Sequence, residues 1–330
     1  MIFDAHLDLA MNVRRGRDVT RPAAEQPRVE GEIATVGLPD LTAGGVSHVG
    51  ATIFCEPGTR AGGYHNADEA FDEAQRQLTI YHDLHARGLI RIVGRPPGAS
   101  AGNAPACVIL IEGADCVRSP ADVRLFKQAG VGVIGLSWQA TRYAGGTGMP
   151  GPLTQAGREI VPAIDAAGLV HDVSHLAEQS FWDLLDVAGG RVIASHSNCR
   201  AIVGEDAKER HLSDAMIRAL LARDGVIGIN FYDRFLLPAE QYKKRRAHLS
   251  DVVAHVRHVC DLAGDARHVG IGTDMDGGLG REQIPFEIAT SGDLPKIGVA
   301  LRDAGFDGEA VACILHKNFA RALLPVGEPT

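Results

Sequence analysis

The chain has 330 residues, 45% of them apolar but only 5% aromatic, and a formal charge of −8 at pH 7. This acidic balance excludes a basic surface for nucleic acid. No apolar leader precedes the first predicted strand and no run of eighteen apolar residues occurs, so we expect neither a signal peptide nor a membrane anchor. Six cysteines without a CxxC pair are typical of reduced thiols. We therefore expect a cytoplasmic protein with no membrane partner.

Short apolar runs typical of buried strands recur along the whole chain. In order, they cover residues 2–9, 47–54, 108–113, 130–138, 169–175, 191–197, 225–232 and 268–278. Helical patterns lie between most of them, at 66–87, 154–167, 177–188, 213–223, 249–263, 293–304 and 308–324. Thr154 and Ser213 are suitable N-cap residues for two of these helices. Eight strand–helix units predict an α/β fold, a closed (β/α)8 TIM-type barrel that comprises residues 1–330 as a single domain.

Loops rich in glycine or proline lie at 56–65, at 144–153 and after Asp274. Over the mouth of a barrel, such loops are expected to shape a pocket. The second contains a G-x-G-x-x-G pattern, but Pro150 interrupts it and no strand–turn–helix junction surrounds it. We therefore expect no dinucleotide site there.

Histidine and acidic residues stand where several of the apolar runs end. These residues are His6, Asp8, Glu112, His175, His196 and Asp274. Active groups of such barrels lie at the carboxyl ends of the strands, so we expect these side chains to converge. Imidazole and carboxylate together suit zinc or a similar divalent ion. No cysteine belongs to the set, which argues against a structural zinc ribbon.

Glu112 and Asp274 have the most specific expected roles. Two metal ions need a bridging anion, and because no lysine directly follows a predicted strand, Glu112 is the expected bridge rather than a carbamylated lysine. Water between two cations loses a proton near neutral pH. Asp274 can accept that proton and pass it to the leaving nitrogen. Asp276 is interpreted as a turn residue, and the following histidines of predicted helices as solvated: His82, His85, His248, His255 and His258.

Several segments together resemble one known family. They read DAHLDL, IEG, LTQAGREIVPAIDAAGLVHDVSH, ASHS, INFY, GIGTDMDG and HKNFARAL. They resemble the membrane (renal-type) dipeptidase family of the amidohydrolase superfamily, from the first strand to the last helix. The resemblance implies a barrel with two zinc ions as cofactors.

The resemblance also implies roles for individual residues. The implied metal ligands are His6, Asp8 and Glu112 for one ion, and Glu112, His175 and His196 for the other. Asp274 is implied as the proton-transfer acid. Arg210, in the segment ERHLSD, is implied to bind the substrate carboxylate, and Tyr232 to line the pocket.

The sequence departs from the family pattern at three places. The fourth strand ends Leu-Ser-Trp138, where the family commonly has Leu-Thr-His, and that histidine helps to polarise the scissile carbonyl. An indole N–H can donate a hydrogen bond, but it cannot replace the imidazole fully. His211 replaces the usual asparagine after Arg210, and the family's His-Asn-Asp-Leu-Pro opening reads His-Leu-Asp-Leu-Ala. The metal ligands are thus retained, while the substrate preference is open at Trp138.

Three functions remain open at this point. The first is binuclear zinc-dependent hydrolysis of the amide bond of dipeptides by a metal-bridging hydroxide, including dipeptides with a D-residue at the C-terminal side. The second keeps the metals but acts on another small amide, an N-acyl amino acid or a lactone. The third is a non-hydrolytic member of the fold, which the complete ligand set disfavours. The expected partners are a small substrate and, as an open alternative, a second copy in a homodimer.

Overall fold

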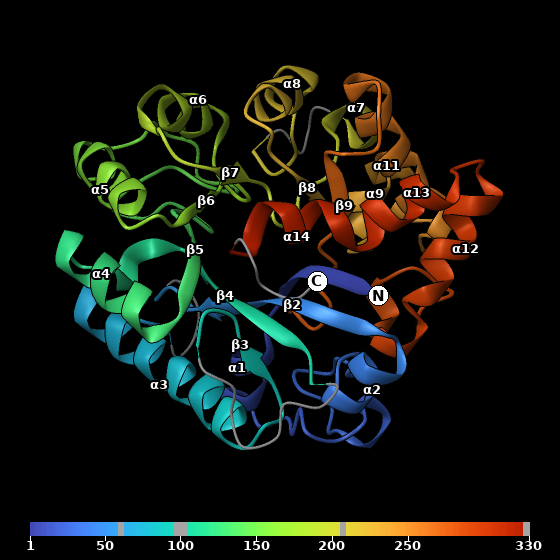
Figure 1. Ribbon diagram of the computed structural model, residues 1–330, viewed down its shortest axis with the longest axis horizontal. Helices are drawn as coiled ribbons and strands as arrows, with labels where there is room; N and C mark the ends of the chain where they lie inside the picture. Colours follow the sequence, from blue (N-terminus) through green and yellow to red (C-terminus); the bar gives the residue numbers. More distant parts are fainter. Residues whose placement is uncertain (59–62, 96–103, 205–208, 326–330) are drawn as a thin grey trace.

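Parallel strands form a ring at the centre of the computed structural model, which describes residues 1–58, 63–95, 104–204 and 209–325 (Figure 1). The strands of the ring are β1 (Ile2–Leu7), β2 (Val46–Phe54), β4 (Ala106–Glu112), β5 (Val131–Gly135), β6 (Val170–Asp172), β7 (Val192–Ile193), β8 (Ile227–Ile229) and β9 (Val269–Ile271). From β1 to β7 each strand of the ring is hydrogen-bonded in parallel to the next, β8 pairs with β9, and β9 pairs with β1. A bridge between Ala194, directly after β7, and Ile227 of β8 completes the circle. The predicted TIM-type barrel is confirmed.

Helices surround the barrel (Figure 1). They are α1 (Leu9–Arg14), α2 (Leu38–Ala43), α3 (Ala67–Ala86), α4 (Pro120–Ala129), α5 (Gln155–Ala166), α6 (Glu178–Val187), α7 (Arg200–Val203), α8 (Asp214–Ala222), α9 (Asp233–Leu236), α10 (Ala239–Tyr242), α11 (Leu249–Ala263), α12 (Pro295–Asp303), α13 (Gly308–Ala312) and α14 (Asn318–Leu323). The expected caps are present, because Thr154 accepts from the Gly157 N–H and Ser213 from the Met216 N–H. Among the described helices, none is both long and apolar enough to cross a bilayer.

One end of the barrel is filled by apolar side chains. Phe319, Ala322 and Leu323 of α14 pack against Phe3 of β1 and against inward residues of the other strands. Figure 1 shows α14 lying across the middle of the ring. Strands buried on both faces explain why the sequence shows continuous apolar runs rather than alternation. The opposite end, where the strands finish, is left for polar side chains.

Several element boundaries differ from the prediction. The first strand ends at Leu7, and Asp8 is the N-cap of α1 rather than a strand residue. The fifth predicted strand, β6, ends at Asp172, three residues before His175. The predicted helix 308–324 is two helices separated by a π-helical turn, Cys313–Lys317. The short strand β3 (Arg91–Ile92), α2 and α4 were not predicted, and residues 59–62 of the 56–65 loop lie outside the described residues.

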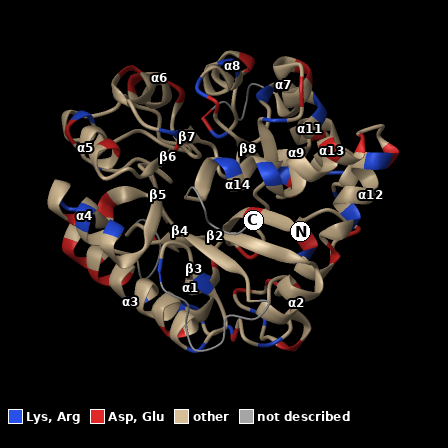
Figure 2. Cartoon of the chain, in the orientation of Figure 1, with Lys and Arg blue, Asp and Glu red and all other residues tan. Residues whose placement is uncertain are grey.

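Two sequence interpretations need correction or refinement. His255 is fully buried on α11 and not solvated: its Nδ1 accepts from the Cys199 N–H, and its Nε2 donates to the Leu236 carbonyl. Asp276 does lie in a turn, but it is buried and forms an ion pair with Arg17 at 3.0 Å. Basic and acidic residues are interspersed over the outer helices (Figure 2).

Candidate active site

The predicted ligands converge at the carboxyl ends of the strands. His6 lies in β1, Asp8 follows it, and Glu112 is the last residue of β4, while His175, His196 and Asp274 each stand three residues beyond their strands. All six are buried. Burying so many ionisable groups without compensating charge would be costly.

Glu112 stands between two groups of side chains. Its Oε2 lies 3.5 Å from His6 Nε2. Its Oε1 lies 3.1 Å from His175 Nε2 and 3.3 Å from His196 Nε2. The two oxygens of one carboxylate thus face different ligand groups, which is the geometry expected of a bridging ligand.

The donor atoms fit divalent cations. His6 Nε2 and Asp8 Oδ1 are buried and form no hydrogen bond to any described residue. The Nε2 atoms of His175 and His196 approach to 2.9 Å, beside the same Glu112 oxygen. Ligand atoms of His6, Asp8 and Glu112 lie within 4.8 Å of one another, as do those of Glu112, His175 and His196. Nitrogen and carboxylate donors gathered in this way are typical of zinc and related ions.

Electrostatics at the site favour added positive charge. Burial alone lowers the pKa of His6, but the carboxylates of Glu112, Asp8 and Asp274 raise it to about 10. Burial raises the pKa of Asp274 to about 6 and that of Asp8 well above its usual value. The carboxylates of Asp8, Glu112 and Asp274 therefore lie together in a buried region. Bound cations would neutralise their negative charge.

One hydroxyl orients a histidine of each ligand group. Ser195 Oγ lies 2.5 Å from Asp172 Oδ2, 2.8 Å from His196 Nδ1 and 3.2 Å from His6 Nδ1. A carboxylate only accepts, so the hydroxyl donates to Asp172 and accepts an N–H from each ring. Both Nε2 atoms are then left as lone pairs beside Glu112, ready for a metal.

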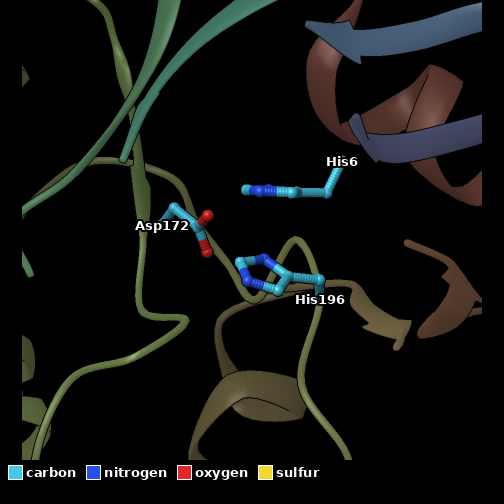
Figure 3. Close-up of side chains that lie close together, drawn as sticks. All are labelled: His6, Asp172 and His196. Carbon is cyan, nitrogen blue, oxygen red and sulfur yellow. The ribbon is translucent and has the colours of Figure 1, made fainter. Parts of the chain in front are cut away.

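Asp172 is a positioning residue rather than a further ligand. Figure 3 shows its carboxylate directed toward the rings of His6 and His196, whose centroids are 3.7 Å apart. Its Oδ1 accepts two backbone N–H groups at 2.9 Å, and its Oδ2 accepts from Ser195. Both oxygens are therefore already used in holding the ligands.

Asp274 presents one oxygen to the site and anchors the other. Its Oδ2 accepts a hydrogen bond of 2.9 Å from Asn230 Nδ2, while its Oδ1 lies 4.0 Å from His6 Nε2. A side chain at Gly277 would place its Cβ 2.0 Å from that Oδ1 and 2.9 Å from Asp8 Oδ2. Only glycine fits at position 277 without displacing both carboxylates.

The sequence also matches the model of a known protein family. The family model of the membrane dipeptidases, peptidase family M19, matches residues 1–328. The chain belongs to this family. The prediction of a metal-dependent dipeptidase is thereby confirmed at the level of the family.

Individual relatives agree with this assignment. A protein of Klebsiella pneumoniae, described only as lying in the pqqA 5′ region, is 31% identical over 77% of this chain and 96% of its own length. Dipeptidase tcpJ of Claviceps purpurea is 31% identical over 53% of this chain, which spans 38% of that enzyme. A metallo peptidase of Rhodobacter sphaeroides, liganded with a phosphinate mimic of L-Ala-D-Ala, has the same fold, with a TM-score of 0.80, 23% identity and 97% of each chain covered.

A cavity of about 330 Å³ opens beside the ligands of this membrane dipeptidase family member. Trp138 and Tyr232, both predicted to bind substrate, line it together with Phe54 and Phe235. The rings of Trp138 and Phe54 meet edge to face, with centroids 5.2 Å apart. Where the family pattern has a histidine, this chain therefore has part of an aromatic wall.

Arg210 is buried and is not among the described residues that line this cavity, but it lies next to Phe235, which does. Its Nη2 donates to the His196 carbonyl at 2.7 Å and its Nη1 to the Ser197 hydroxyl at 3.2 Å. The guanidinium lies 4.8 Å from the Phe235 ring centroid. The buried Nε of Arg210 has no hydrogen-bond partner among the described residues. This N–H group can therefore donate to another acceptor.

Sequence reasoning missed the residues that hold the ligands. Asp172, Ser195 and Asn230 support the histidines and Asp274, and Thr147 Oγ1 lies 2.9 Å from His175 Nδ1. Thr147 belongs to the 144–153 loop, which does line the pocket as predicted. The sequence offered one indication of these supporting residues, which is a polar residue close to a predicted ligand. Polar residues are common at strand ends, so this indication does not single them out.

Proposed function

We propose that this protein binds two zinc ions and hydrolyses dipeptides that carry a free C-terminal carboxylate. One ion would be held by His6, Asp8 and Glu112, and the other by Glu112, His175 and His196. The single observation that carries the proposal is the division of the Glu112 oxygens between the two groups, at 3.5 Å on one side and 3.1–3.3 Å on the other. Three imidazoles in the donor set favour zinc over magnesium or calcium.

The bound ions would polarise the scissile carbonyl and lower the pKa of water. The residues of the chain supply the remaining functions. Asp274 Oδ1 faces the ligands and would take the proton of the attacking water, then give it to the leaving nitrogen. Asn230 keeps that carboxylate in place through Oδ2. Trp138 and Tyr232 would cover the substrate and exclude bulk water.

We extend the proposal to dipeptides with a D-residue at the C-terminal side, as in the ligand of the Rhodobacter sphaeroides relative. A second candidate is hydrolysis of N-acyl amino acids, for which the aromatic wall of Trp138 and Phe54 is suitable. Both substrate classes present a carboxylate to Arg210. They differ in whether a free amino group is needed.

Amidation of the C-terminal carboxyl group of a dipeptide is expected to raise KM and to cost about 2–4 kcal/mol in kcat/KM, because buried Arg210 would lose its anionic partner. Arg210→Ala is expected to cost about the same with the free dipeptide. The two losses should not add, since they remove the same interaction. Steady-state kinetics on both substrates with both proteins measure this directly.

Arg87→Ala, an exposed arginine at the end of α3, is the matched control and should leave all four values unchanged. Metal content is measured on each variant, because Arg210 also contacts the His196 carbonyl. Equal kcat/KM for the free and amidated dipeptides in the wild-type protein would contradict the dipeptidase proposal.

A further inference from the structure

A second cavity adjoins the one beside the ligands. It has a volume of about 320 Å³, and the two cavities share Met11, Arg15 and Phe54 in their walls. Met11 and Arg15 lie on and directly after α1, which Asp8 caps. Arg15 is therefore joined by a short rigid segment to a proposed metal ligand, and it stands where one cavity passes into the other.

Three guanidinium groups and three carboxylates line the second cavity. Arg14 binds both oxygens of Glu73 at 3.1 Å, and Arg76 shares that carboxylate at 3.3 Å. Arg15 Nη2 donates to Glu56 at 2.9 Å. These three guanidinium groups thus form ion pairs with two of the three carboxylates, Glu73 and Glu56. Figure 2 shows basic residues at α1 in blue.

The remaining acidic residue of the lining is Glu69, which is committed elsewhere. It accepts from the His65 backbone N–H at 2.7 Å and from Asn66 Nδ2 at 2.8 Å, at the start of α3. Each carboxylate of the cavity therefore already has donors, which disfavours a basic ligand. Among the described residues, the Arg15 guanidinium donates only through Nη2, so its other N–H groups can bind an anionic ligand.

The barrel places Arg15 across the site from Arg210. Arg210 lies in the segment that follows β7, whereas Phe54 is the last residue of β2 and Arg15 is the C-cap of α1, the helix that follows β1. In the ring, β2 and β7 stand on opposite sides (Figure 1). A dipeptide whose C-terminal carboxylate is bound by Arg210 would direct its N-terminal residue toward Arg15 and the second cavity.

We propose that Arg15 and the second cavity form a subsite for a side-chain carboxylate on the N-terminal residue, so that preferred substrates begin with glutamate or aspartate. This inference rests on the proposed dipeptidase activity and its substrate orientation. The planar guanidinium of Arg15 would bind the side-chain carboxylate, with Arg14 and Arg76 adding positive charge from the outer wall.

The test compares Glu-Ala with Gln-Ala, which differ only in the charge of the first side chain. The zinc-loaded wild-type protein should prefer Glu-Ala by about tenfold or more in kcat/KM. Arg15→Met should abolish that preference, Arg15→Lys should retain part of it, and Arg87→Met should retain all of it. The loss should appear mainly in KM, because the carboxylate is remote from the reacting bond.

The outcomes separate this proposal from the one on which it rests. If zinc-loaded wild-type protein cleaves neither dipeptide, the proposed function itself is wrong. If it cleaves both equally, or if the preference survives Arg15→Met, only the acidic subsite is wrong. Faster cleavage of Lys-Ala than of Glu-Ala would also overturn it and would assign the cavity to a basic side chain through Glu56.

Discussion

Asp274→Asn is expected to lower turnover by about 10²–10⁴, the range for loss of a general acid–base group, while metal content and folding stay unchanged. The asparagine oxygen can still accept the Asn230 hydrogen bond, so the side chain should keep its place. The amide lacks the basicity to take a proton from water. Measurement of kcat together with zinc content on the same sample tests this.

Asp303→Asn, on the exposed face of α12, is the matched control and should have wild-type kinetics. A wild-type kcat in Asp274→Asn would mean that another group transfers the proton. Glu112 is then the next candidate, because it lines the same cavity and its two oxygens lie beside the ligands of both groups.

Glu112→Gln is expected to weaken metal binding more than the loss of any other single ligand. The amide nitrogen replaces one of the two oxygens, and a nitrogen that carries two protons cannot coordinate a cation. One of the two proposed ions, either the one beside His6 or the one beside His175 and His196, must therefore lose the ligand that both ions share. Because removal of a mere supporting group typically costs 10–100-fold in metal affinity, we expect a loss of at least about 10²-fold here.

Competition with a chelator of known affinity measures the constants for both ions in Glu112→Gln. Glu309→Gln, an exposed change on α13, serves as the control for loss of a carboxylate. Retention of two tightly bound ions in Glu112→Gln would contradict a bridging role and would leave the Glu112 oxygens as hydrogen-bond acceptors only.

The barrel and the ligand set could be predicted because buried parallel strands leave a plain pattern. A strand covered on both faces needs a continuous apolar run, and β1, β2 and β4 are buried along nearly their whole length. The polar residue that ends such a run must lie at the carboxyl face of the barrel. His6 and Glu112 were found in this way.

Backbone conformation near the ligands could not be read from residue types. His175 and Asp274 have φ values of 68° and 60°, in the left-handed region that non-glycine residues rarely adopt. The strand prediction rests on side chains that alternate between two faces, and it contains no information about a positive φ at His175 or Asp274. The run at 2–9 likewise concealed the change from strand to helix at Asp8, because Leu7 and Leu9 are buried in either conformation.

The groups that orient the ligands were missed for a different reason. Ser195 and Asp172 act through one hydroxyl proton whose direction depends on three partners from β1, β6 and the segment after β7. No spacing in the sequence encodes such a three-way contact. Buried His255 was misjudged in the same way, since its partners at Cys199 and Leu236 lie far from it along the chain.

The most direct test of this account is a titration of chelator-treated protein with zinc, in which bound metal and dipeptide hydrolysis are measured in the same samples. We predict no hydrolysis without metal and full activity at two zinc ions per chain, with weaker zinc binding in the Glu112→Gln variant. Full activity of the metal-free protein, or saturation at one ion per chain, would contradict the binuclear site.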